Sequence, residues 1–178
     1  MLKYLPSLAS AALGLLSVTA THASTWYTFS QTQTDTALYF FDLDTVVMQG
    51  DTLTIWVKYV NDPMNPDGDG SFATAQKYNF ICSKRTLQVF TSATYDKAGK
   101  FIRAFPIVGK VKEATPGSIA EGLVTAVCAP DFPKNKSHDL YFQVRGNDIL
   151  RHTADYFENQ RAISTDPAPK LYPQSYLR

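Results

Sequence analysis

Two pairs of carboxylates are the first residues in this sequence that could do chemistry. Asp67 and Asp69 lie in segment 65–70, which reads Asn-Pro-Asp-Gly-Asp-Gly, and oxygen ligands at alternate positions before a glycine are typical of calcium loops. Gln76 occupies the twelfth position from Asn65, where such a loop has a bidentate glutamate, and strands are predicted on both sides. These departures favour a solvated loop between two strands over a metal site.

The second pair, Asp42 and Asp44, lies two residues apart on one side of the end of an aromatic strand and could support acid–base chemistry, although isolated pairs of this kind are usually turn or solvent-facing residues. His138 and His152 are the only histidines after residue 23, and the chain has no Gly-x-Ser-x-Gly motif. Ser118 fits a helix start. The sequence therefore predicts no catalytic residues, no enzyme activity, no metal and no cofactor.

Residues 1–23 have the features of a secretory signal peptide. Lys3 is the only charged residue, the apolar stretch that follows is too short to cross a bilayer, and small residues surround Ala23. We place cleavage after Ala23, with Ala20 as the alternative; a membrane anchor is less favoured because polar residues follow at once. We expect a periplasmic or secreted protein without a transmembrane segment after removal of the signal.

The two cysteines, Cys82 and Cys128, are expected to form a disulfide because export places them in an oxidising compartment. The alternatives are a metal site and a catalytic thiol. Neither a Cys-x-x-Cys motif nor a nearby histidine supports them.

Composition narrows the range of partners. The 178 residues carry a net charge of +1, with 19% charged and 13% aromatic residues. A near-neutral chain has no basic surface for nucleic acid, and the abundant aromatic residues exclude disorder for its main part. Aromatic side chains, which dominate protein-binding surfaces, are the one kind in surplus.

Residues 26–105 show the alternation of β-strands. In Thr52–Val60, Leu53 and Ile55 share one face, whereas Trp56 lies on the other, where it must meet a helix, the C-terminal residues or a partner. The other predicted strands are Ala37–Val47, Ala73–Ser83, Thr86–Tyr95 and Phe101–Ile107, with Trp26–Phe29 as a short edge strand.

A helix is predicted from Thr115–Ser118 to Cys128, since Ile119, Leu123 and Val127 recur at helical spacing. Pro130 ends it, and a disulfide from Cys128 would fix the helix to one face of the sheet. Farther on, the pattern indicates a polar linker, a strand, a second helix and a Pro-rich tail (131–137, 140–144, 148–161 and 164–178), with a glycosylation sequon at 135–137.

The order of these features resembles the surface-adhesin protein E-like domain of Gram-negative bacteria. The features are Trp26, the aromatic strand Tyr39–Val46, the segment Thr54–Val57, Cys82, the turn Tyr95–Gly99, and Thr115–Ser118 ahead of Cys128. The resemblance implies an α+β fold: a single antiparallel sheet of about five or six strands with a helix tethered to one face by the disulfide. It also implies an exported protein that binds host or envelope proteins.

These inferences divide the chain into a signal peptide (1–23), an adhesin-like domain (24–130) and a C-terminal extension (131–178), partly helical with a disordered tail. The expected function is non-enzymatic recognition of a protein partner through an aromatic-rich sheet surface. The alternative is an envelope structural or assembly protein that acts as a homo-oligomer, for example by pairing of sheet edges. The sequence does not identify the binding residues, the ligand or the oligomeric state.

Overall fold

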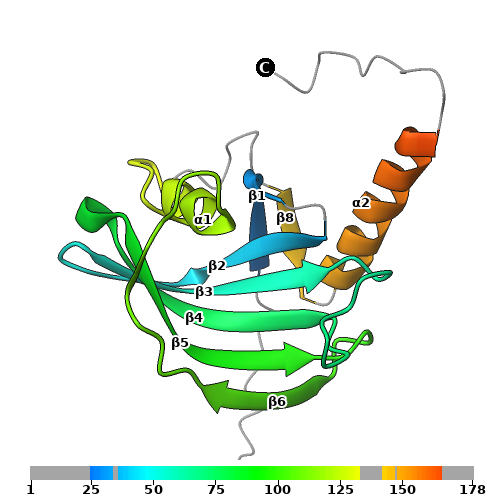
Figure 1. The fold of residues 1–178 in the computed structure, drawn as a ribbon, viewed down its shortest axis with the longest axis horizontal. Coiled ribbons are helices and arrows are strands. Elements are labelled where there is room, and N and C mark those ends of the chain that lie inside the picture. The colour runs from blue at the N-terminus through cyan, green and yellow to red at the C-terminus, as the bar shows by residue number, and fades with distance from the viewer. Residues whose placement is uncertain (1–24, 34–35, 133–141, 147, 166–178) are drawn as a thin grey trace, which may run out of the picture.

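The computed structural model describes residues 25–33, 36–132, 142–146 and 148–165, and its strands form one antiparallel sheet (Figure 1). The strands are β1 (Thr25–Gln33), β2 (Ala37–Gln49), β3 (Thr52–Asn61), β4 (Ala73–Ile81), β5 (Thr86–Tyr95), β6 (Phe101–Pro106), β7 (Lys112–Glu113) and β8 (Phe142–Arg145). Their order is β6-β5-β4-β3-β2-β1-β8, and the short β7 pairs with β5. The α+β class and the single antiparallel sheet are confirmed, but the sheet has eight strands, more than predicted.

The prediction of an edge strand at Trp26–Phe29 is wrong. β1 lies inside the sheet, where Trp26 is paired with Asp42 of β2 on one side and with Val144 of β8 on the other. The cause is a long-range pairing, because β8 comes from the C-terminal part of the chain and occupies the edge that β1 would otherwise leave open.

Helix α1 (Ile119–Val127) covers one face of the sheet. Ser118 caps it, because its hydroxyl accepts a hydrogen bond from the backbone N–H of Glu121 at 3.3 Å, while the Glu121 carboxylate accepts one from the N–H of Gly117. Beneath the helix lies the first core cluster, which joins Leu123, Val124, Ala126 and Val127 to Tyr27, Phe41, Leu43, Leu53, Ile55, Val57, Tyr78, Phe80, Leu87 and Phe132.

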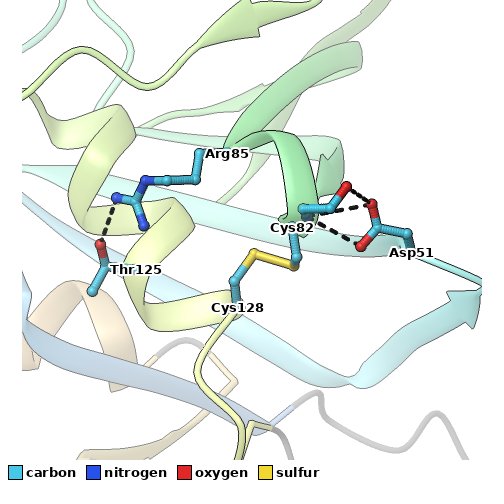
Figure 2. The surroundings of a disulfide bond; sticks show 6 residues. Asp51, Cys82, Arg85, Thr125 and Cys128 are labelled. Carbon is cyan, nitrogen blue, oxygen red and sulfur yellow. Dashed lines mark hydrogen bonds between the residues drawn. A yellow bond between two sulfur atoms is a disulfide. The ribbon is translucent and has the colours of Figure 1, made fainter.

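The disulfide between Cys82 and Cys128 ties α1 to the end of β4, with the two Cα atoms 5.5 Å apart (Figure 2). Cys82 opens a 3-10 turn, and the carboxylate of Asp51 accepts hydrogen bonds from the backbone and hydroxyl of Ser83 in that turn. Arg85 follows and reaches the hydroxyl of Thr125 on α1 at 3.3 Å. Hydrogen bonds therefore hold both sides of the cross-link in place.

Helix α2 (Asp148–Thr165) packs against β8 and β3 and lies beside β8 in Figure 1. The core clusters place it on the opposite face of the sheet from α1. Ile149 and Phe157 are buried there with residues of β1–β4 and β8, namely Trp26, Leu38, Phe40, Val60, Ala73 and Val144. Trp56 packs against this second cluster, so it lies on the face of the sheet where the C-terminal residues are buried. Arg161 also donates to both carboxylate oxygens of Asp62, at 2.9 and 2.8 Å.

Lys58 lies on this second face between two aromatic rings. Its Nζ atom is 4.7 Å from the ring centre of Trp26 and 4.4 Å from that of Tyr95. Burial disfavours the charged amine and outweighs the opposing effect of Asp42, which lowers the pKa of Lys58 to about 8.

We expect the free energy of unfolding to rise between about pH 8 and about pH 10, because unfolded Lys58 retains a proton that folded Lys58 loses. Above about pH 10 the trend should reverse. Burial raises the pKa of Tyr39 to about 12, so the unfolded tyrosine ionises first. Denaturant titrations over this pH range should show the rise in the wild-type protein and lose it in Lys58→Met. The same rise in both proteins would contradict the interpretation.

Candidate binding surface

Strand β6 is an edge strand whose residues are all exposed to solvent. It forms the outer border of the sheet in Figure 1, and no described segment pairs with its second side. Its large apolar side chains are exposed by 54% at Phe101, 48% at Ile102 and 38% at Phe105. The edge therefore offers unpaired main-chain groups together with apolar surface, the combination that favours pairing with another chain.

β6 has little of the protection that natural edge strands usually have. Lysines, prolines within the strand and covering loops normally prevent unwanted pairing. The only charged residue of β6 is Arg103, and its guanidinium is drawn to one face, where it pairs with Asp69 at 2.6 Å and lies 5.5 Å from the ring centre of Phe105. The single proline, Pro106, is the last residue of the strand.

Aromatic rings flank the edge on both faces of the sheet. Phe101 pairs with Tyr95 of β5, and the two rings meet edge to face with their centres 6.1 Å apart on the α2 side. Phe105 pairs with Ser92 and belongs to the α1 side. A strand added to β6 would thus have an aromatic ring beside it on each face.

A shallow groove of about 260 Å³ lies on the α1 side next to Phe105. Hydroxyl groups dominate its floor, which is formed by Ser71, Thr74, Ser92 and Thr94. The loop between β3 and β4 (62–72) closes one end, and Phe105 and Ile107 form an apolar wall. The groove could accept a polar side chain from a strand paired with β6.

The carboxylates of the calcium-like segment fasten the loop to the sheet. Asp67 accepts a hydrogen bond from the hydroxyl of Tyr59 at 3.3 Å, and Asp69 accepts one from the hydroxyl of Ser71 at 2.7 Å and pairs with Arg103. Hydrogen bonds from Ser71 lower the pKa of Asp69 below its ordinary value. Among the described residues, no group of three or more histidines, cysteines or acidic residues could hold a metal ion.

The other candidates from the sequence that the structure describes lie on elements other than β6. Asp42 is buried and its carboxylate accepts from the backbone N–H of Asp44 at 3.2 Å, where the pairing of β2 with β3 is irregular. His152 is on α2 with its ring 6.3 Å from that of Phe40, and burial lowers its pKa. Ser118 is the cap of α1. His138 and the sequon at 135–137 lie outside the described residues.

Comparison with known protein families gives a match to this chain. A family model described as surface-adhesin protein E matches residues 26–129. No curated protein matches the chain. In the part of the chain that the structure describes, no helix has the length and apolar character needed to cross a membrane.

Solved structures with a similar arrangement include protein E of Haemophilus influenzae in its second crystal form. That structure is 11% identical in sequence, and the match covers 51% of this chain and 79% of that chain with a TM-score of 0.39. Protein E of non-typeable Haemophilus influenzae is also 11% identical, with 68% of this chain and 82% of that chain covered and a TM-score of 0.37. At these levels the structures give no information about ligands.

Proposed function

Because this chain belongs to the surface-adhesin protein E family and is thus an adhesin-like surface protein, we propose that it captures a protein partner through the β6 edge. The observation that carries this proposal is the exposure of a whole edge strand with three large apolar side chains. The expected partner is a host or envelope protein with an extended segment, and the activity is binding without catalysis.

Strand addition would supply both affinity and selectivity. Main-chain hydrogen bonds to β6 do not depend on the partner's sequence, whereas its alternate side chains would meet Phe101 on one face and Phe105 with the polar groove on the other. In this proposal, the aromatic-rich sheet surface expected from the sequence is the β6 edge with Phe101 and Phe105. Most of the other aromatic residues whose burial the structure describes belong to the two core clusters or pack against them, so they are less suited to binding.

The disulfide, the N-terminal residues and the roles of Ser118 and His152 support the proposal of an exported binding protein. A disulfide is typical of proteins in oxidising compartments, and residues 1–23, which resemble a signal peptide, would direct the protein to the periplasm or the medium. Ser118 and His152 have structural roles, in a helix cap and against a core ring. We retain the division at residue 130 as part of the proposal, with the C-terminal residues completing the sheet around a family-like domain.

Charged substitutions on β6 should weaken capture of the partner without unfolding the protein. We expect Ile102→Lys combined with Phe105→Lys to reduce the affinity for envelope or host-matrix proteins by about tenfold or more, since charge on an edge opposes pairing. Immobilised wild-type and variant proteins would be compared for the specific proteins retained and for the dissociation constant of each purified partner.

The matched control replaces exposed apolar residues away from β6. Met64→Lys and Ile163→Lys change side chains exposed by 72% and 42% and should leave binding unchanged. Equal loss of binding in the control, or full binding by the β6 variant with an unchanged melting temperature, would contradict the proposal.

A second copy of the chain is the alternative occupant of the edge. Two β6 strands could pair antiparallel about a twofold axis, which would make the protein an assembly component. Light scattering with mass determination separates the alternatives at tens of micromolar protein. A dimer that becomes a monomer in the Ile102→Lys and Phe105→Lys variant would favour assembly, whereas a wild-type monomer would exclude it.

A further inference from the structure

A second cavity, of about 300 Å³, lies between α1 and β5 and has a different character from the polar groove. Its walls are apolar and come from Tyr39, Leu87, Val89, Ile119 and Leu123. Two lysines, Lys110 and Lys112, also line it, and no acidic residue does. The volume is at the lower end of the range of roughly 300–1,000 Å³ found for small-molecule sites.

The segment that carries both lysines is held over the cavity at several points. The side-chain amide of Gln88 donates to the carbonyl of Gly109 at 2.8 Å, and the N–H of Ile107 donates to the carbonyl of Phe90 at 3.0 Å. At Gly109 a Cβ atom would lie 2.5 Å from the carbonyl oxygen of Val89, so only glycine allows this approach. The cavity wall is therefore built into the fold.

The two lysines at the cavity have no acidic partner among the described residues. Neither Lys110 nor Lys112 forms an ion pair with any described residue, and Glu121 on the nearby helix pairs with Arg85 at 3.5 Å. Tyr78 also lines the cavity; its hydroxyl donates to the side chain of Gln76 at 2.6 Å, and burial raises the pKa of this hydroxyl so that it remains neutral. An apolar cavity with two cations and no anion matches an apolar ligand with an anionic end.

We propose that this cavity binds a single-chain fatty acid, with the tail between α1 and β5 and the carboxylate at Lys110 and Lys112. The charge complementarity selects an anion, and the apolar walls select a hydrocarbon tail. The volume admits one short chain in place of the two of a phospholipid. Ile107 is the single residue that lines both this cavity and the groove beside β6, and the charges and walls used here are otherwise separate, so the two proposals can fail separately.

Titration calorimetry with decanoate tests the assignment on the purified protein. We expect saturable binding of decanoate and at least about tenfold weaker binding of decanol, which has the same tail without the charge. Lys110→Gln combined with Lys112→Gln should weaken decanoate to the level of decanol. Ala120→Phe, which places a ring in the cavity, should abolish binding of both ligands while the melting temperature stays the same or rises.

The matched control is Lys97→Gln combined with Lys100→Gln, which removes two charges from the β5–β6 turn and should not change the affinity. Equal binding of decanoate and decanol would overturn the charge assignment, and an unchanged affinity in Ala120→Phe would overturn the location. Lysine-dependent binding to anionic phospholipid vesicles without binding of decanoate would identify a membrane contact and refute the proposal.

Discussion

Replacing both cysteines by serine is expected to lower the free energy of unfolding by about 4 kcal/mol, the upper end of what a cross-link over 46 residues contributes. The cross-link lowers the conformational entropy of the unfolded chain, and in the folded protein it holds α1 against the first core cluster. Denaturant unfolding of wild-type protein and of the Cys82→Ser, Cys128→Ser variant measures the difference. The midpoint should fall strongly in the variant.

Reductant provides the internal control for this experiment. It should move the wild-type midpoint toward that of the double variant and leave the variant unchanged. Identical wild-type transitions with and without reductant would show that the disulfide contributes nothing to stability, against the prediction. Arg85 and Thr125, which join the same elements by a hydrogen bond, remain in both proteins and so do not affect the comparison.

Truncating Phe40 is the second substitution with a large expected effect. The Phe40 ring is completely buried in the second core cluster and meets the ring of His152 on α2. Phe40→Ala should therefore cost about 3–5 kcal/mol, since it removes apolar contacts and leaves a cavity. Thermal unfolding should still show one transition, at a lower temperature, if α2 and the sheet unfold together.

Ile163→Ala, at an exposed position of α2, is the matched control and should change stability by less than about 0.5 kcal/mol. Two separate transitions in the wild-type protein would show that α2 and β8 form an independent unit. That result would contradict the view that the C-terminal residues complete the core on the second face.

Local patterns in the sequence predicted most elements of the fold. The alternation in β3 placed Leu53 and Ile55 on one face and Trp56 on the other, and this is confirmed because the two sets belong to different core clusters. Which of the two faces α1 covers was not predicted. The helix at 119–127 could be predicted because its apolar spacing, its Ser118 cap and Pro130 lie close together in the chain. Such signals need no knowledge of distant partners.

Features that depend on contacts between residues far apart in the sequence could not be predicted from local patterns. β8 pairs with β1 across more than a hundred residues, and no local signal says which strand a short apolar run will join. Phe132 was assigned to a polar linker, yet it is buried with its ring 6.2 Å from that of Phe41. The exposed edge could not be predicted for the same reason. The sequence of β6 is that of an ordinary strand, and only the order of the strands in the sheet places it at the edge.

Amide hydrogen exchange on β6 is the most direct test of the central claim. In the free protein, the outward-facing amides of residues 101–105 should exchange quickly, since no described strand covers them. In complex with a captured partner, strand addition predicts slowing of these amides by about tenfold or more. Protection confined to other elements, with β6 exchanging as in the free protein, would contradict binding at this edge.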